Sequence, residues 1–168
     1  MIAGVFGVMW TLWGASGLDE PAALVVRLVG IVIGVGLVAG SIRAVRRFPG
    51  TPGSGSLFSD TRYRIIVVAE VVAIAAGGIV LNATGNPQYV CPWVAPVVGI
   101  HFLVFGRIFW AGFALLGAVL VGAAVLGTAL GLVTGDGGIV IATTALITAA
   151  AMFASGGRTL ISTAEARV

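Results

Sequence analysis

The chain has 168 residues, of which 59% are hydrophobic and only 9% are charged, whereas about a quarter of a soluble domain is usually charged. With a mean hydropathy of +1.14, this composition excludes an ordinary soluble domain and predicts one integral membrane domain over residues 1–168. The net charge of +3 comes from arginines beside apolar segments, which indicates membrane topology and not nucleic-acid binding.

Six apolar stretches are long enough to cross a hydrocarbon core of about 30 Å, so we predict an all-α bundle of six transmembrane helices. In chain order they cover about residues 2–17, 21–42, 64–83, 88–108, 110–133 and 138–157. The polar turns ASGLDEP, NATGNPQ and VTGDGG join them as three antiparallel hairpins. Asp19 with Pro21, and Asn86 with Pro87, are typical of a capping residue before a first-turn proline.

The charged residues predict which end of the bundle is cytoplasmic. Asp19, Glu20 and Asp136 fall at the turns between paired helices, whereas the arginines gather at the other end of the hairpins. That basic set is Arg43, Arg46, Arg47, Arg62, Arg64, Arg107, Arg158 and Arg167. Because basic loops are retained in the cytoplasm, both termini are expected there. The basic residues are all arginine and glycine is abundant, which favours a bacterial cytoplasmic (inner) membrane.

The only sizeable predicted loop covers about residues 43–63 and contains RFPGTPGSGSLFSD. Proline, glycine and serine predict a flexible segment, and the flanking arginines are expected to hold its ends at anionic lipid headgroups. We interpret it as a tether on the cytoplasmic side, with a regulatory or partner-binding loop as the alternative.

Glycines spaced by four or five residues predict close helix packing. Gly30 and Gly34 lie on the second helix, and Gly117 and Gly122 on the fifth. Small residues let membrane helices approach closely, because lipid gives little hydrophobic drive for association. The same faces could bind a second copy of the chain or another membrane protein, and spacing does not separate these uses.

Glu70 is the residue of this chain that most strongly suggests a functional site. It lies in the apolar run VVAEVVAIAA of the third helix, where a charged side chain costs at least a few kcal/mol unless it is paired, protonated or hydrated. Ala73 and Gly77 follow it at helical spacing, which favours a face packed against protein.

The chain's only histidine, His101, is the expected partner of Glu70. The turn of this hairpin centres between Gly85 and Asn86, so antiparallel helices of equal rise place Glu70 and His101 at one depth. The pair could exchange a proton, because histidine titrates near neutral pH. A structural pair is the alternative, as is a glutamate that reaches the cytoplasmic interface and Arg64 or Arg107.

Three further polar residues are weaker candidates for binding an ion or substrate. Arg27, early in the second helix, could bind an anionic group, but snorkelling or pairing with Asp19 or Glu20 explains it adequately. Thr144 and Thr148 share a face of the sixth helix and could line a polar path. Hydroxyls in membrane helices more often bond to their own backbone carbonyls.

The sequence contains no nucleophile elbow, zinc motif or phosphate-binding loop, and Cys91 is its only cysteine. We therefore expect no metal and no cofactor, and we leave catalysis open while leaning against it. The leading hypothesis is a small transporter or channel-like protein with Glu70 and His101 as its proton or cation site. The alternatives are an intramembrane enzyme acting on a lipid or isoprenoid, and an accessory subunit of a larger membrane complex. The ligand would be a small solute, an ion or a lipid.

Overall fold

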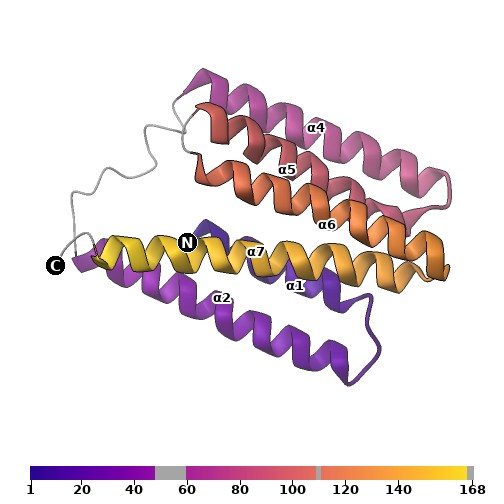
Figure 1. Ribbon diagram of the computed structural model, residues 1–168, viewed down its shortest axis with the longest axis horizontal. Helices are drawn as coiled ribbons and strands as arrows, with labels where there is room; N and C mark the ends of the chain where they lie inside the picture. The colour runs from indigo at the N-terminus through magenta and orange to yellow at the C-terminus, as the bar shows by residue number, and fades with distance from the viewer. Residues whose placement is uncertain (48–59, 109–110, 166–168) are drawn as a thin grey trace.

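The computed structural model describes residues 1–47, 60–108 and 111–165, and this part of the chain forms six α-helices and one short 3₁₀ helix, with no strand (Figure 1). The prediction of an all-α, six-helix bundle is confirmed. The elements are α1 Ile2–Ala15, α2 Ala22–Arg47, α4 Thr61–Ala83, η1 Pro87–Tyr89, α5 Val90–Ile108, α6 Gly112–Thr134 and α7 Gly137–Glu165.

The helices that flank the predicted loop are longer than expected, so residues 43–47 and 61–63 are helical and not part of a loop. Arginine is a good helix former, and a positive charge in the last turn of α2 is stabilised by the helix dipole. At the start of α4, the Asp60 carboxylate caps the helix by accepting a hydrogen bond from the Arg62 backbone N–H at 2.8 Å. The middle of the predicted loop, residues 48–59, lies outside the described residues.

The turns between paired helices are formed largely as predicted. Gly85, which follows α4, and Gly135, which ends α6, both have positive φ angles, of 74° and 72°, a conformation that glycine adopts without steric cost. The chain then reverses, so that α5 runs back along α4 and α7 runs back along α6 (Figure 1). One difference is that η1 precedes α5, where a continuous helix was predicted from about residue 88.

The six helices lie in a folded row in the order α2, α1, α7, α6, α5, α4 (Figure 1). Additional contacts of α7 with α2 and α5 make α7 the central helix. The fully buried side chains include Cys91 of α5, Leu120 of α6, and Val140 and Thr144 of α7. The core is therefore centred on α5, α6 and α7, whereas α2 and α4 form the two edges.

Glycine brings neighbouring helices close enough for their backbones to touch, as the spacing predicted. A side chain at Gly99 of α5 would lie 2.8 Å from the Gly117 carbonyl oxygen of α6, and one at Gly34 of α2 would lie 3.0 Å from the Gly4 carbonyl oxygen of α1. Gly36 and Gly122, by contrast, have nothing within 4 Å of the position that a side chain would take. Some of the glycines therefore lie at contacts between helices of this chain, whereas Gly36 and Gly122 do not.

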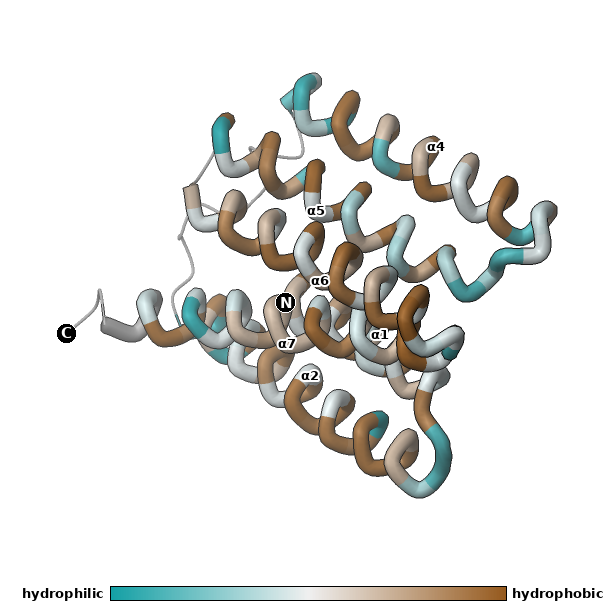
Figure 2. Tube along the Cα trace, turned by 45° about the vertical axis from the view of Figure 1, so that its right-hand side comes forward, coloured by the Kyte–Doolittle hydropathy of each residue, from teal (hydrophilic) through white to brown (hydrophobic). Residues whose placement is uncertain are grey.

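Among the described residues, five helices are long and apolar enough to cross a membrane, namely α2, α4, α5 (with η1), α6 and α7. The helix α1 ends at Ala15 and rises only about 21 Å, less than the core of about 30 Å. Hydrophobic residues run along each helix, and hydrophilic residues gather mostly at helix ends and turns (Figure 2). These features indicate a membrane protein whose apolar helix faces contact lipid.

The alternating helix directions bring the helix ends that carry most of the arginines to one end of the bundle (Figure 1), and Arg27 is the exception in the described part of the chain. The last turns of α2 and α5 and the first turn of α4 carry Arg46, Arg107 and Arg62, whereas Asp19 and Asp136 lie at the opposite end. The separation of charges expected from the sequence is therefore present in the described part of the chain, while Arg167 lies outside it.

Candidate functional site

Glu70 of α4 and His101 of α5 form a pair across the helix interface. The Glu70 Oε2 atom lies 2.6 Å from His101 Nδ1, and the side chains are only 16% and 10% exposed. This distance is that of a short charge-assisted contact, but Nδ1 is buried without a well-aligned hydrogen bond. The contact is therefore a close carboxylate–imidazole pair, and the distance between its two atoms does not depend on where the hydrogen is placed.

The pair forms because α4 presents one narrow stripe of residues to α5. The partly buried residues of α4 recur every three or four positions, whereas the remaining residues of the helix are exposed. The members of the stripe are Tyr63, Ile66, Val67, Glu70, Ala73, Ile74, Gly77, Gly78 and Leu81. Glu70 lies in the middle of this stripe, so its carboxylate points at protein, as Ala73 and Gly77 had suggested.

Trp93 holds α4 and α5 in register. Its indole Nε1–H donates a hydrogen bond to the Ala73 carbonyl oxygen at 3.0 Å. Gly77 makes this possible, since any side chain there would overlap the Trp93 indole. The contact lies on the same stripe as Glu70, so it fixes the relative depth of the two helices close to the pair.

Aromatic rings lie beside the pair, on the side that faces the arginine-rich end of the bundle. The ring centroid of Phe105 lies 4.0 Å from that of His101, and Tyr63 stacks on Phe105 with a centroid distance of 5.1 Å. Phe102 contacts the His101 ring edge-on and stacks on Phe113 of α6. Rings from α4, α5 and α6 therefore form one cluster beside the pair.

These aromatic residues were not predicted as part of the site from the sequence. The signal was present, because Phe105 follows His101 by one helical turn and Tyr63 precedes Glu70 by two turns on the same face. The contribution of Phe113 from α6 depends on how α5 packs against α6, which spacing within one hairpin does not reveal.

The two arginines proposed as alternative partners of Glu70 do not pair with it. Arg64 and Arg107 are exposed, and within the described residues neither forms an ion pair with the carboxylate. The earlier start of α4 also places Glu70 nine residues after Thr61, or about 13 Å along the helix axis. Glu70 is therefore deeper than expected, and His101 is its partner.

Arg27 pairs with Glu20 at the opposite end of the bundle. Its Nη1 atom donates a hydrogen bond to Glu20 Oε1 at 2.8 Å, with the two side chains 39% and 58% exposed. Glu20 also accepts a hydrogen bond from the Leu24 backbone N–H. This is the simple pairing considered from the sequence, although Glu20 and not Asp19 provides the capping carboxylate.

Thr144 and Thr148 lie in the core between α6 and α7 and are fully buried. The Thr148 hydroxyl donates a hydrogen bond to the Thr144 carbonyl oxygen at 2.8 Å, and the Thr144 hydroxyl lies 3.5 Å from the Ala123 carbonyl oxygen of α6. Both hydroxyls therefore contact backbone carbonyl groups within the packed α6–α7 interface. This interface is separate from the α4–α5 interface that contains Glu70 and His101.

No group of three or more metal-ligating His, Cys, Asp or Glu side chains occurs in the described ranges. Two surface hollows formed by described residues lie away from the Glu70–His101 pair. One is lined by Arg43, Arg46 and Arg47 at the end of α2, and the other by Gln88, Asp136 and their neighbours at the opposite end. Comparison of the chain with protein-family models, curated proteins and solved structures finds no match.

Proposed function

We propose that this protein is a small transporter or channel-like protein of the bacterial inner membrane and that the Glu70–His101 pair is its proton or cation site. The observation that carries the proposal is the 2.6 Å contact between the carboxylate and the imidazole, at 16% and 10% exposure. An ionisable pair inside a membrane protein is expensive to maintain, which favours a functional role. The arginine-rich end of the bundle is taken as cytoplasmic.

The charge states of the pair explain why it would exchange a proton for a cation. With one proton between them, the two side chains are together neutral, either as carboxylate and imidazolium or as carboxylic acid and imidazole. Loss of that proton leaves a net charge of −1 in a low-dielectric interface, which costs at least a few kcal/mol. A small cation at the site would replace the missing positive charge, so proton release and cation binding are coupled.

The edge position of α4 supplies a simple way to open the pair. This helix packs mainly against α5 and η1, and none of its residues is buried. Its attachment rests on the Glu70–His101 contact, the Trp93–Ala73 hydrogen bond and the Tyr63–Phe105 stack. A change of charge at the pair removes one of these contacts and allows α4 to move relative to α5.

The proposal is tested by proton flux in proteoliposomes that contain a trapped pH-sensitive dye, with Na⁺ or K⁺ gradients imposed in turn. Wild-type protein should move protons in response to one of these gradients, and Glu70→Gln and His101→Ala should each abolish the movement. The matched control is Arg27→Gln, which breaks an ion pair outside the site and should conduct like the wild type. Equal flux in all four proteins, or flux equal to that of empty liposomes, would reject the proposal.

A lipid-modifying enzyme is a second candidate, favoured by the exposed surface beside the pair. Ile100 and Val71, the chain neighbours of His101 and Glu70, are 56% and 59% exposed, so lipid can approach the interface. Glu70 would act as general acid or base. Lipid extracts from membranes with and without the protein, compared by mass spectrometry, should then show a product that is absent with Glu70→Gln.

A further inference from the structure

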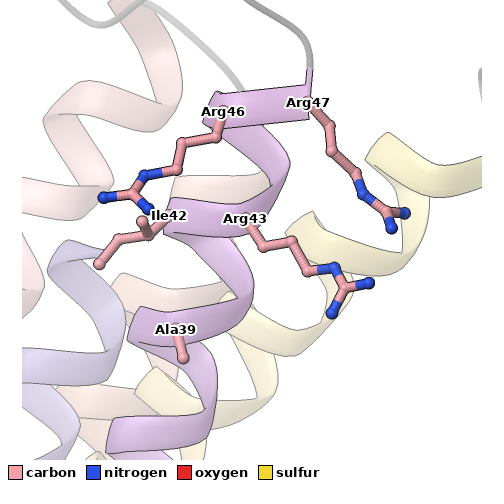
Figure 3. A pocket seen from close by; sticks show the side chains of 5 residues that line it. All are labelled: Ala39, Ile42, Arg43, Arg46 and Arg47. Atoms are coloured by element: carbon pink, nitrogen blue, oxygen red, sulfur yellow. The ribbon is translucent and has the colours of Figure 1, made fainter.

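A hollow at the basic end of α2 combines positive charge with an apolar floor. It has a volume of about 550 Å³ and is lined by Ala39, Ile42, Arg43, Arg46 and Arg47. These positions recur every three or four residues and therefore share one face of α2. Figure 3 shows the Arg43 and Arg47 side chains extending in the same direction, toward α7, and Arg46 extending to the other side, near Ile42.

The side chains that line this hollow carry three positive charges and no negative charge. Among the acidic side chains that the structure places, Glu20 pairs with Arg27 and Glu70 pairs with His101. Asp60 caps α4, and Asp136 caps α7 at the opposite end. The carbonyl end of the α2 dipole offsets only a fraction of one charge. The hollow therefore attracts an anion.

The apolar surface below the hollow identifies what kind of anion fits. Val32 and Val35 on the outer surface of α2 are 70% and 61% exposed. Gly36, between them and Ala39, has no protein atom within 4 Å of the position that a side chain would occupy. An exposed apolar track, notched at this glycine, thus leads along the helix to the arginines. The apolar track is suited to contact an acyl chain, and the positive charge of the arginines is suited to bind a phosphate.

We propose that this hollow binds the headgroup of an acidic phospholipid, with its acyl chains along Val32, Gly36 and Ala39. Arginine suits this role because its planar guanidinium can donate two parallel hydrogen bonds to one phosphate. The last turn of a membrane helix lies at headgroup depth, where the polar and apolar parts of a lipid meet both parts of the hollow. The site is independent of the proton or cation site between α4 and α5.

The test is native mass spectrometry of the full chain with equal amounts of phosphatidylglycerol and phosphatidylcholine. Phosphatidylglycerol should bind preferentially to the wild type. Replacing Arg43, Arg46 and Arg47 together with glutamine should lower that preference by roughly tenfold or more, because each juxtamembrane arginine contributes about fivefold in affinity for anionic lipid. Ala39→Phe, which fills the hollow and keeps its charges, should also lower it.

The matched control replaces Arg62, Arg64 and Arg107 with glutamine, removing the same charge from the same end but outside the hollow. This control should retain most of the preference for phosphatidylglycerol. Equal losses in the two triple variants would show a general surface charge effect and would overturn the proposal. So would displacement of the bound lipid by millimolar inorganic phosphate, because the site would then hold a soluble anion.

Discussion

Replacing Gly77 with alanine tests how α4 is attached to α5. A methyl group at this position would overlap the Trp93 indole, whereas a methyl group at the neighbouring Gly78 would have no atom within 4 Å. Both substitutions add the same group to the same helix. The change in helix propensity, about 1 kcal/mol in favour of alanine, therefore cancels when the two variants are compared.

The remaining difference in the free energy of unfolding between the two variants can be estimated from the contacts of Trp93. Displacing the indole removes its hydrogen bond to the Ala73 carbonyl oxygen, which contributes roughly 0.5–1.5 kcal/mol between membrane helices. Overpacking of a close contact adds about 1–3 kcal/mol. Gly77→Ala should therefore be less stable than Gly78→Ala by about 2–4 kcal/mol, a factor of roughly 30 to 1,000 in the unfolding equilibrium constant.

The assay is reversible unfolding in mixed micelles, in which the SDS fraction is raised and the loss of helix is followed by circular dichroism. Tryptophan fluorescence should also change in Gly77→Ala before unfolding, because the Trp93 indole moves out of its contact with α4. Equal unfolding midpoints for the two variants would refute the packing of α4 described above.

Three further predictions use the same unfolding assay. Leucine at either Glu70 or His101 alone should destabilise the fold by about 3–5 kcal/mol, and leucine at both should restore most of that loss; additive losses would contradict a direct pair. Gly117→Val should cost about 1–3 kcal/mol more than Gly122→Val, because only Gly117 touches the α5 backbone; equal costs would contradict that contact. Arg27→Gln should change stability by less than about 1 kcal/mol, because its ion pair is exposed; a larger loss would contradict this.

The sequence predicted the helices and the depth of the pair because both depend on local rules. Apolar length determines which segments can span a membrane, and Gly85 and Gly135 supply the backbone conformation that the turns require. Two antiparallel helices rise equally from a shared turn, so reflection through Gly85 and Asn86 carried Glu70 onto the depth of His101.

The features that the sequence did not predict depend on how helices from different hairpins pack. Nothing in the apolar run of α4 distinguishes an edge helix from a central one, because lipid and protein interiors are equally apolar. The contact of Phe113 with Phe102 likewise requires α6 to pack beside α5. The continuation of α2 through Arg47 was missed because the basic residues were assigned to the loop.

The contact between Glu70 and His101 in a lipid bilayer tests the central claim most directly, and its histidine signal needs no assignment because the chain contains one histidine. Protein labelled with ¹⁵N-histidine and ¹³C-glutamate in lipid vesicles should show dipolar transfer between the imidazole nitrogen and a glutamate carboxyl carbon by solid-state NMR, because Glu70 Oε2 lies 2.6 Å from His101 Nδ1. Glu70→Gln should lose this transfer, and Arg27→Gln should keep it. Absence of the transfer in the wild type would contradict a direct contact between Glu70 and His101.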